Sequence, residues 1–151
     1  MADHIYKRHN KTLLIYHIVC PAKYRRDIFT PKVEETLKRI CLELQIPYEM
    51  NFIEIGADIN HVHFLVQTIP NKSVTEIITT IKSITAKHIF KLHPEIKKVL
   101  YGGNLWTSGY YANTVGQYGN LKILENYVKN QGIPEYKQLH QGQPTLFDIG
   151  A

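Results

Sequence analysis

Two histidines separated by a single residue, His61 and His63, are the side chains with the clearest chemical potential in this sequence. They lie in the run 61–66, whose branched and aromatic residues are typical of a β-strand. Residues two apart in a strand point to the same face and lie about 6.5–7 Å apart along it, so both imidazoles can bind one divalent metal ion. Val62 and Phe64 then point the other way, into a core. An ordinary pair of polar-face histidines has the same spacing, and this alternative stays open.

A second candidate lies in the amphipathic segment 121–131, which begins after Gly119 and ends before Gly132 and Pro134. Its apolar residues recur at helical spacing and predict a helix that packs by one stripe: Leu121, Leu124 and Val128. Tyr127 and Gln131 are four residues apart, so they share a neighbouring face of this helix. A phenol oxygen can attack a phosphorus atom, and an amide carbonyl can serve as a third, oxygen ligand of a metal ion. The alternative is a tyrosine at the rim of the core and a solvated glutamine.

Hydrophobic patterns predict the elements that must position these side chains. Strands are expected at 12–20, 47–56, 60–67 and 105–113, and helices at 30–44, 73–92 and 121–131. The short link 57–59 is expected to join the second and third strands as a hairpin. The order β-α-β-β-α-β followed by an extra helix indicates an α+β protein with a ferredoxin-like, RRM-like sandwich. In that topology the first and third strands are central, so the histidine pair would lie on a rigid strand and Tyr127 on the additional C-terminal helix.

Length and composition limit the possible organisation and partners. The 151 residues are enough for one domain with a proper core, which we place at 11–134, between a polar N-terminal segment at 1–10 and a C-terminal tail at 135–151. Eighteen basic and thirteen acidic residues give a net charge of +5, which favours a polyanionic partner such as nucleic acid. No apolar run reaches the roughly 20 residues needed to cross a bilayer. Cys20 and Cys41 lack the spacing of a zinc site and are expected to be buried thiols in a reducing cytoplasm.

A group of basic and aromatic side chains follows the first predicted strand: Lys23, Tyr24, Arg25 and Arg26. Guanidinium groups bind phosphate bidentately, and an aromatic ring can stack on an unpaired base, so this group is a candidate DNA-binding site. Lys82 and Lys87 fall off the apolar stripe of the helix at 73–92 and are expected to add phosphate contacts. Each lysine has an alternative role as a solvated residue of the helix surface.

Several blocks of the chain resemble the single-tyrosine HUH transposases, which move small insertion sequences as single-stranded DNA. Residues 61–66 are similar to the His-hydrophobe-His motif of this family, and 125–131 to its Tyr-x-x-x-Gln helix. Residues 16–26 resemble its first strand with the basic segment that follows, and 105–116 its fourth strand. One departure is Asn60, because the family often has Asp just before the first histidine. Asp58 is then the nearby carboxylate, either as an extra metal ligand or as a hairpin-turn residue.

The resemblance implies a DNA transposase that cleaves and rejoins single-stranded DNA at insertion-sequence ends, with 11–134 as its catalytic domain. Tyr127 would be the nucleophile and form a 5′-phosphotyrosine link, while His61, His63 and Gln131 would bind Mg²⁺ or Mn²⁺. The implied partners are DNA hairpins near the element ends and a second copy of the chain, in a homodimer whose active sites are shared between subunits. No membrane partner is expected, and the protein is expected in the cytoplasm.

Other functions on the same scaffold stay open. One is a non-catalytic module that binds hairpin DNA or RNA, as RNA-recognition domains do. Another is a metal-dependent phosphohydrolase with water as its nucleophile, which would have no use for Tyr127. A third is a domesticated tyrosine transposase of the same superfamily that acts on repeated extragenic palindromes.

Overall fold

The computed structural model describes residues 2–116 and 121–132, so the predicted tail at 135–151 lies outside the described residues. The main sheet contains four antiparallel strands in the order β4-β5-β3-β6. Their bounds are Leu14–Pro21 for β3, Asn51–Asp58 for β4, His61–Thr68 for β5 and Tyr111–Val115 for β6. The strand that carries the histidine pair is therefore one of the two central strands, as the element order predicts.

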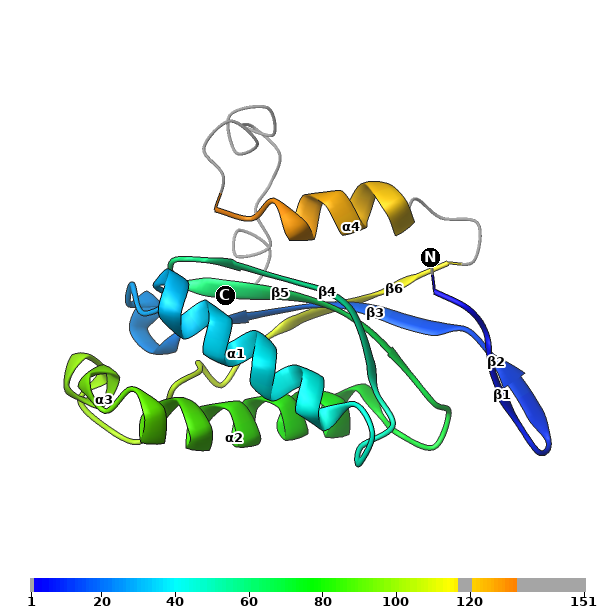
Figure 1. Cartoon of the computed structure of the whole chain (residues 1–151), viewed down its shortest axis with the longest axis horizontal. Helices are drawn as coiled ribbons and strands as arrows, with labels where there is room; N and C mark the ends of the chain where they lie inside the picture. Colours follow the sequence, from blue (N-terminus) through cyan, green and yellow to red (C-terminus); the bar gives the residue numbers. More distant parts are fainter. Residues whose placement is uncertain (1, 117–120, 133–151) are drawn as a thin grey trace.

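Helices cover both faces of this sheet. Figure 1 shows α1 (Pro31–Leu44) and α2 (Val74–Leu92) on one face and α4 (Leu121–Lys129) on the other. The predicted start of α2 is confirmed, since Ser73 Oγ accepts from the Glu76 amide at 3.1 Å and the Glu76 carboxylate accepts from the Ser73 amide at 3.2 Å. This capping box satisfies amide groups that have no partner within the helix. Within the described part of the chain, no helix combines the length and apolar character that a bilayer crossing requires.

Alternation along β5 divides its side chains between two buried layers. Val62, Phe64 and Val66 belong to the main core, together with buried residues of α1 and α2. His63 and Leu65 point to the opposite face, where they are buried on the side that α4 covers. The histidine pair therefore lies between the sheet and the last helix.

The fourth strand is shorter than predicted. We expected a strand at 105–113, but β6 begins only at Tyr111. Before it, Trp106 forms an isolated antiparallel bridge with Ala22, with backbone bonds from Lys23 to the Leu105 carbonyl and from Thr107 to the Pro21 carbonyl. The same segment is also held against α2: the indole Nε1 of Trp106 donates to Thr85 Oγ1 at 3.0 Å, and Lys82 Nζ donates to the Thr107 carbonyl at 2.8 Å. The predicted strand is therefore interrupted between this bridge and Tyr111.

Other boundaries differ from the predictions in ways that geometry explains. The strand expected at 47–56 begins at Asn51 and continues through Asp58, so the hairpin turn is only the pair at 59–60. The polar N-terminal segment forms a small hairpin from β1 (Ile5–Lys7) and β2 (Asn10–Thr12). The short helix α3 (Glu95–Leu100) lies between the predicted helix at 73–92 and the predicted strand at 105–113, where no element was expected. The short, largely exposed strands of this hairpin bury little apolar surface, so their patterns are weak.

Candidate active site

His61 and His63 form the first part of the candidate site. Their ring centroids are 5.1 Å apart, with the ring planes at 61°. The tight turn at 59–60 places His61 at the very start of β5, where it is partly exposed, while His63 is 2% exposed. The two rings therefore lie on one face of a central strand, one near solvent and one enclosed.

A third imidazole, which sequence reasoning missed, completes this cluster. His17 of β3 places its Nε2 atom 2.9 Å from Nδ1 of His63, and the two rings stack with centroids 5.2 Å apart. His17 is paired with Leu65 in the ladder, so it reaches His63 diagonally across the two strands. The alternation of β3 indicates which face His17 occupies, but the register that brings it to His63 is set by the fold.

Tyr127 of α4 lies directly against this cluster. Its ring meets the His63 ring edge to face, with centroids 5.5 Å apart and planes at 82°. The structure thus brings the predicted nucleophile and the predicted metal-binding pair together within one chain.

Gly56 makes this close approach possible. A Cβ atom at Gly56 would lie only 1.6 Å from the carbonyl oxygen of Val128, a backbone atom of α4. Gly56 is also the ladder partner of His63. The helix therefore approaches β4 most closely beside the histidine that Tyr127 contacts, at a position where only glycine fits.

Gln131 lies in the turn just after α4, which ends at Lys129 rather than at the predicted 131, and it is close to the same glycine. Its Cβ atom would be 3.3 Å from a Cβ at Gly56. Its Nε2 atom donates to the Tyr127 carbonyl at 3.0 Å, so the amide is anchored to its own helix. The amide oxygen, which would be the metal-binding atom, takes no part in that bond. A role for Gln131 as a ligand stays a prediction.

Asp58 and Asn60 surround His61. Asp58 Oδ1 accepts from the Ile59 amide at 2.7 Å, which is the hairpin-turn role considered for it, and Asp58 is also the ladder partner of His61. Asn60 Oδ1 lies 2.8 Å from His61 Nδ1. Because an amide oxygen only accepts, this contact assigns the proton to Nδ1 and the lone pair of His61 to Nε2. A role for Asp58 as a metal ligand stays a prediction.

Burial keeps two of the three imidazoles in their neutral form. Burial lowers the pKa of His17 to about 4. The pKa of His63 is held well below its ordinary value, first by burial and then by the neighbouring His61 and His17. The neutral imidazole is the form that binds metal ions, because one of its nitrogens has a free lone pair.

A family model described as "Transposase IS200 like" matches residues 10–131 of this chain. The chain belongs to the IS200-like transposase family. It is 28% identical over 118 residues to the ISDra2 transposase TnpA of Deinococcus radiodurans, which covers 78% of this chain and 84% of that protein. It is 26% identical over 131 residues to the transposase for insertion sequence element IS200 of Salmonella typhimurium, across 87% of this chain and 85% of that protein.

Solved structures share the fold of this IS200-like transposase. A crystal structure of a candidate transposase from Deinococcus radiodurans superposes with a TM-score of 0.69 at 24% identity, covering 84% of this chain and 97% of that one. The structure of a REP-associated tyrosine transposase bound to a REP hairpin gives a TM-score of 0.55 at 9% identity. The match covers 85% of this chain and 70% of that one. At these identities, the similarity supports a common mixed α+β fold.

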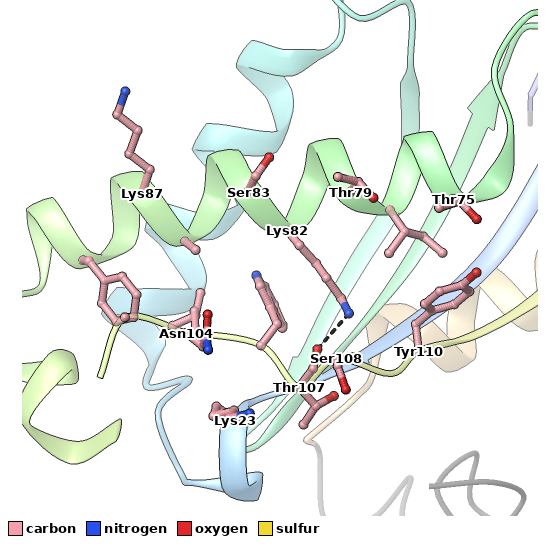
Figure 2. Close-up of a pocket in the computed structure, with 16 residues that line it drawn as sticks. Lys23, Thr75, Thr79, Lys82, Ser83, Lys87, Asn104, Thr107, Ser108 and Tyr110 are labelled. Atoms are coloured by element: carbon pink, nitrogen blue, oxygen red, sulfur yellow. Dashed lines mark hydrogen bonds between the residues drawn. The ribbon is translucent and has the colours of Figure 1, made fainter. Parts of the chain in front are cut away.

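The predicted DNA-binding residues of the transposase divide into two groups. Lys23, Lys82 and Lys87 line a cavity of about 660 Å³ along α2, with Trp106 and Tyr110 also in its wall (Figure 2). Tyr24, Arg25 and Arg26 instead lie exposed around the 3-10 turn Lys23–Arg25. The cavity follows the helix on the face of the sheet opposite to α4, so it is separate from the histidine cluster.

Lys82 has a structural role in this cavity. Its ammonium group donates to the carbonyls of Thr107 and Gly109, at 2.8 Å and 2.9 Å, and lies over the Tyr110 ring. Burial lowers its pKa. Two of its three donors are thus committed to the segment before β6, which reduces its capacity to bind phosphate. Lys87 is exposed and has no such commitment among the described bonds.

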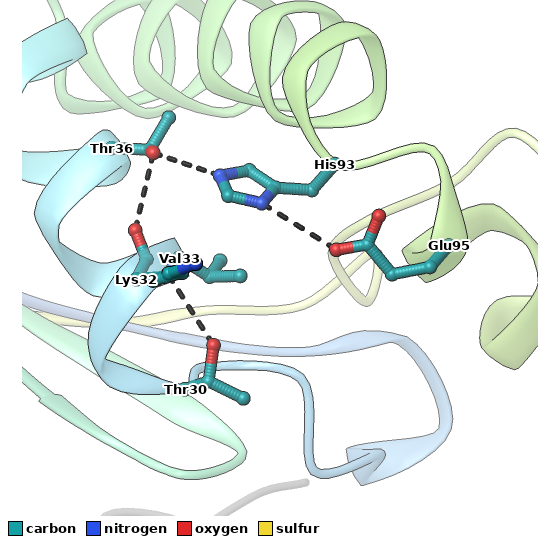
Figure 3. Close-up of polar contacts among 6 residues, drawn as sticks. All are labelled: Thr30, Lys32, Val33, Thr36, His93 and Glu95. Carbon is teal, nitrogen blue, oxygen red and sulfur yellow. Dashed lines mark hydrogen bonds and ion pairs between the residues drawn. The ribbon is translucent and has the colours of Figure 1, made fainter.

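A further histidine, His93, forms polar contacts that connect helices. His93 Nε2 lies 2.8 Å from Thr36 Oγ1, and His93 Nδ1 lies 3.5 Å from a Glu95 carboxylate oxygen (Figure 3). These contacts connect the end of α2 to α1. His93 is remote from α4 and gives a matched comparison for the histidines of the candidate site.

Proposed function

We propose that this DNA transposase cleaves and rejoins single-stranded DNA through Tyr127, with a divalent metal ion held beside it. The observation that carries the proposal is the edge-to-face contact between the Tyr127 and His63 rings, 5.5 Å between centroids. A phenol packed against an imidazole pair has more than a packing role available to it. The His63 ring contacts both the Tyr127 ring and the His61 ring, with centroids 5.5 Å and 5.1 Å away, so a phosphate bound at the partly exposed His61 would lie on the face of the sheet that holds the phenol.

His61, His63 and the amide oxygen of Gln131 would hold the ion, with Asp58 as a further candidate. The described residues contain no group of three or more His, Cys, Asp or Glu side chains arranged for a metal, and in this proposal the Gln131 amide oxygen supplies the third ligand. Two imidazoles with one oxygen fit Mn²⁺ well and can accept Mg²⁺. When bound, the ion would supply positive charge to the scissile phosphate.

The chemistry of the chain itself is a transesterification at phosphorus. The Tyr127 oxygen forms a bond to the phosphorus, the bond from phosphorus to the 3′ oxygen breaks, and the phenolic proton is lost as the 3′ oxygen gains one. The products are a 5′-phosphotyrosine and a free 3′-hydroxyl. Because one ester replaces another, attack by a 3′-hydroxyl on the phosphotyrosine reverses the step and joins strands without a nucleotide cofactor.

We further propose the arrangement of the fold, the form of the DNA substrate, the oligomeric state and the compartment from the family and the fold. The strand order β4-β5-β3-β6 supports a ferredoxin-like arrangement in which α4 is the additional, nucleophile-bearing helix. The DNA would be a single strand with hairpins near the element ends, and the protein a cytoplasmic homodimer with shared active sites. Cys20 and Cys41, both free and buried, agree with a reducing compartment.

The decisive experiment uses labelled single-stranded DNA with a hairpin beside a cleavage site, incubated with the protein and Mn²⁺. We expect a protein–DNA adduct that survives denaturation, and its loss in Tyr127→Phe and with EDTA. Cleavage by Tyr127→Phe at the rate of the unmodified protein would contradict the proposal and favour a water nucleophile. Binding of the hairpin with no cleavage by any form would favour the non-catalytic module.

A further inference from the structure

The inner nitrogen of His63 is engaged by another imidazole, whereas a metal-binding histidine usually donates to a carboxylate, a backbone carbonyl or water. His17 Nε2 lies 2.9 Å from His63 Nδ1, and the ring planes differ by only 20°. His17 is 4% exposed and His63 2% exposed. The contact is therefore shielded from bulk water and held in one geometry.

One proton lies between these two nitrogens, and its position decides what the outer nitrogen of His63 can do. If Nδ1 of His63 carries the proton, it donates to His17 and leaves a lone pair on Nε2 of His63. If Nε2 of His17 carries the proton, a neutral His63 must carry its own proton on Nε2 and cannot bind a metal ion there. Only the first arrangement suits a metal site.

We propose that His17 is a positioning residue, which accepts the Nδ1 proton of His63 and so keeps the Nε2 lone pair of His63 available for the metal ion. This inference rests on the proposed metal role of His61 and His63. The surroundings of His17 fix it for such a role: it lies on β3 between β5 and β6, and the Tyr111 ring meets it edge on, with centroids 6.4 Å apart.

The first test compares Mn²⁺ affinity by calorimetry in two variants at this position. His17→Leu removes the acceptor, and we expect the dissociation constant to rise about 10-fold to 100-fold, the usual effect of losing such a partner. His17→Gln restores an acceptor oxygen near the place of Nε2. The Mn²⁺ affinity of this variant should therefore be close to that of the unmodified protein. The matched control is His93→Leu, which removes a similar imidazole bond at a remote site and should leave Mn²⁺ affinity unchanged.

The second test uses the unmodified protein, so it does not depend on whether the His17→Leu variant folds. In protein labelled with ¹⁵N-histidine and loaded with Zn²⁺ as a diamagnetic probe, His63 should show a protonated Nδ1, with coupling across the hydrogen bond to Nε2 of His17. A His63 signal with the proton on Nε2 would overturn the inference. The His63→Gln variant assigns the signal.

The two proposals fail in different ways. If His63→Gln loses Mn²⁺ binding while His17→Leu binds as tightly as the unmodified protein, the positioning role is wrong and the metal site stands. If His61→Gln and His63→Gln both bind Mn²⁺ normally, the proposed metal site is wrong, and the role of His17 is wrong with it.

Discussion

Single residues in this protein show how burial, more than residue type, decides what a histidine does. His61 is partly exposed and bonded to Asn60, and His63 is enclosed and bonded to His17. Both therefore have one nitrogen engaged by a neighbour, and the proton position in that contact decides whether the other nitrogen carries a lone pair. His93, with the same chemistry, joins two helices instead (Figure 3). Position in the fold separates a candidate ligand from a structural imidazole.

The buried imidazoles make the stability of the protein depend on pH. In the unfolded chain His17 has its ordinary pKa of 6.5, whereas burial lowers it to about 4 in the folded state. Between these values the unfolded state therefore binds more protons than the folded state. The contribution of the neutral His17 to stability is complete above pH 6.5 and is lost as the pH falls towards 4. From pH 7 to pH 5, His17 alone should lower the free energy of unfolding by about 2 kcal/mol.

Urea unfolding in EDTA at pH 7 and pH 5 measures this effect, since EDTA removes any contribution from metal binding. Between pH 7 and pH 5, the free energy of unfolding should fall less in His17→Leu than in the unmodified protein, by about 2 kcal/mol. The exposed His88 is the control, and His88→Gln should keep the full pH dependence. An identical pH dependence in His17→Leu and in the unmodified protein would show that His17 titrates normally in the fold.

Secondary-structure elements were largely predictable because their signals are local. The capping box of α2, the stripe of α1 and the alternation of β5 each depend on residues a few positions apart. The segment 105–110 was predicted as continuous strand, but only Trp106 forms a bridge, to Ala22, and Lys82 and Thr85 of α2 also bind the segment through side chains, contacts that are not local in sequence. The pairing of His17 with His63 was missed for the same reason, since it depends on strand register.

The packing of α4 on β4 is an element-scale contact that one side chain can break. In Gly56→Ala, the new Cβ would meet the Val128 carbonyl oxygen, a backbone atom that cannot rotate away. The helix must then move from the sheet and carry Tyr127 away from His63. We expect adduct formation to slow by at least about 10-fold and the free energy of unfolding to fall by about 1–3 kcal/mol, the usual cost of overpacking.

Gly102→Ala is the control for this substitution, because a Cβ there meets nothing within 4 Å and its backbone φ is not in the left-handed region. It should form the adduct at the unmodified rate with unchanged or slightly higher stability. Adduct rates on a hairpin substrate and urea unfolding curves measure both effects. Normal adduct formation by Gly56→Ala would mean that the contact between α4 and β4 is not needed for catalysis.

At the level of the whole molecule, the two faces of the sheet carry two different groups of polar side chains. The face under α4 holds the imidazoles and Tyr127, while the cavity along α2 on the other face has lysine and aromatic side chains (Figures 1 and 2). If the proposed roles hold, DNA bound along α2 and a phosphate at the imidazoles would lie on opposite faces of the sheet. The alternation of β5 and the predicted element order give the central strand and the face of the imidazoles, whereas the packing of α4 over that face and the cavity along α2 are set by the fold.

The shared active site of the proposed homodimer leads to a prediction about mixed dimers. In the structure Tyr127 contacts His63 of its own chain, and exchange of α4 between two copies would form the same contact between chains. Tyr127→Phe and His63→Gln should each be inactive alone, since each lacks one half of the site. If α4 is exchanged, a mixed dimer contains one site with an intact tyrosine and an intact imidazole pair.

Co-expression of the two variants with different affinity tags tests this arrangement. Random pairing makes half of the dimers mixed, each with one active site of two, so adduct formation should recover to about a quarter of the unmodified level. Dimers purified through both tags in sequence should recover to about half, because every one of them is mixed. Doubly tagged dimers that form no adduct would contradict exchange and establish the contact between Tyr127 and His63 of one chain as the working site.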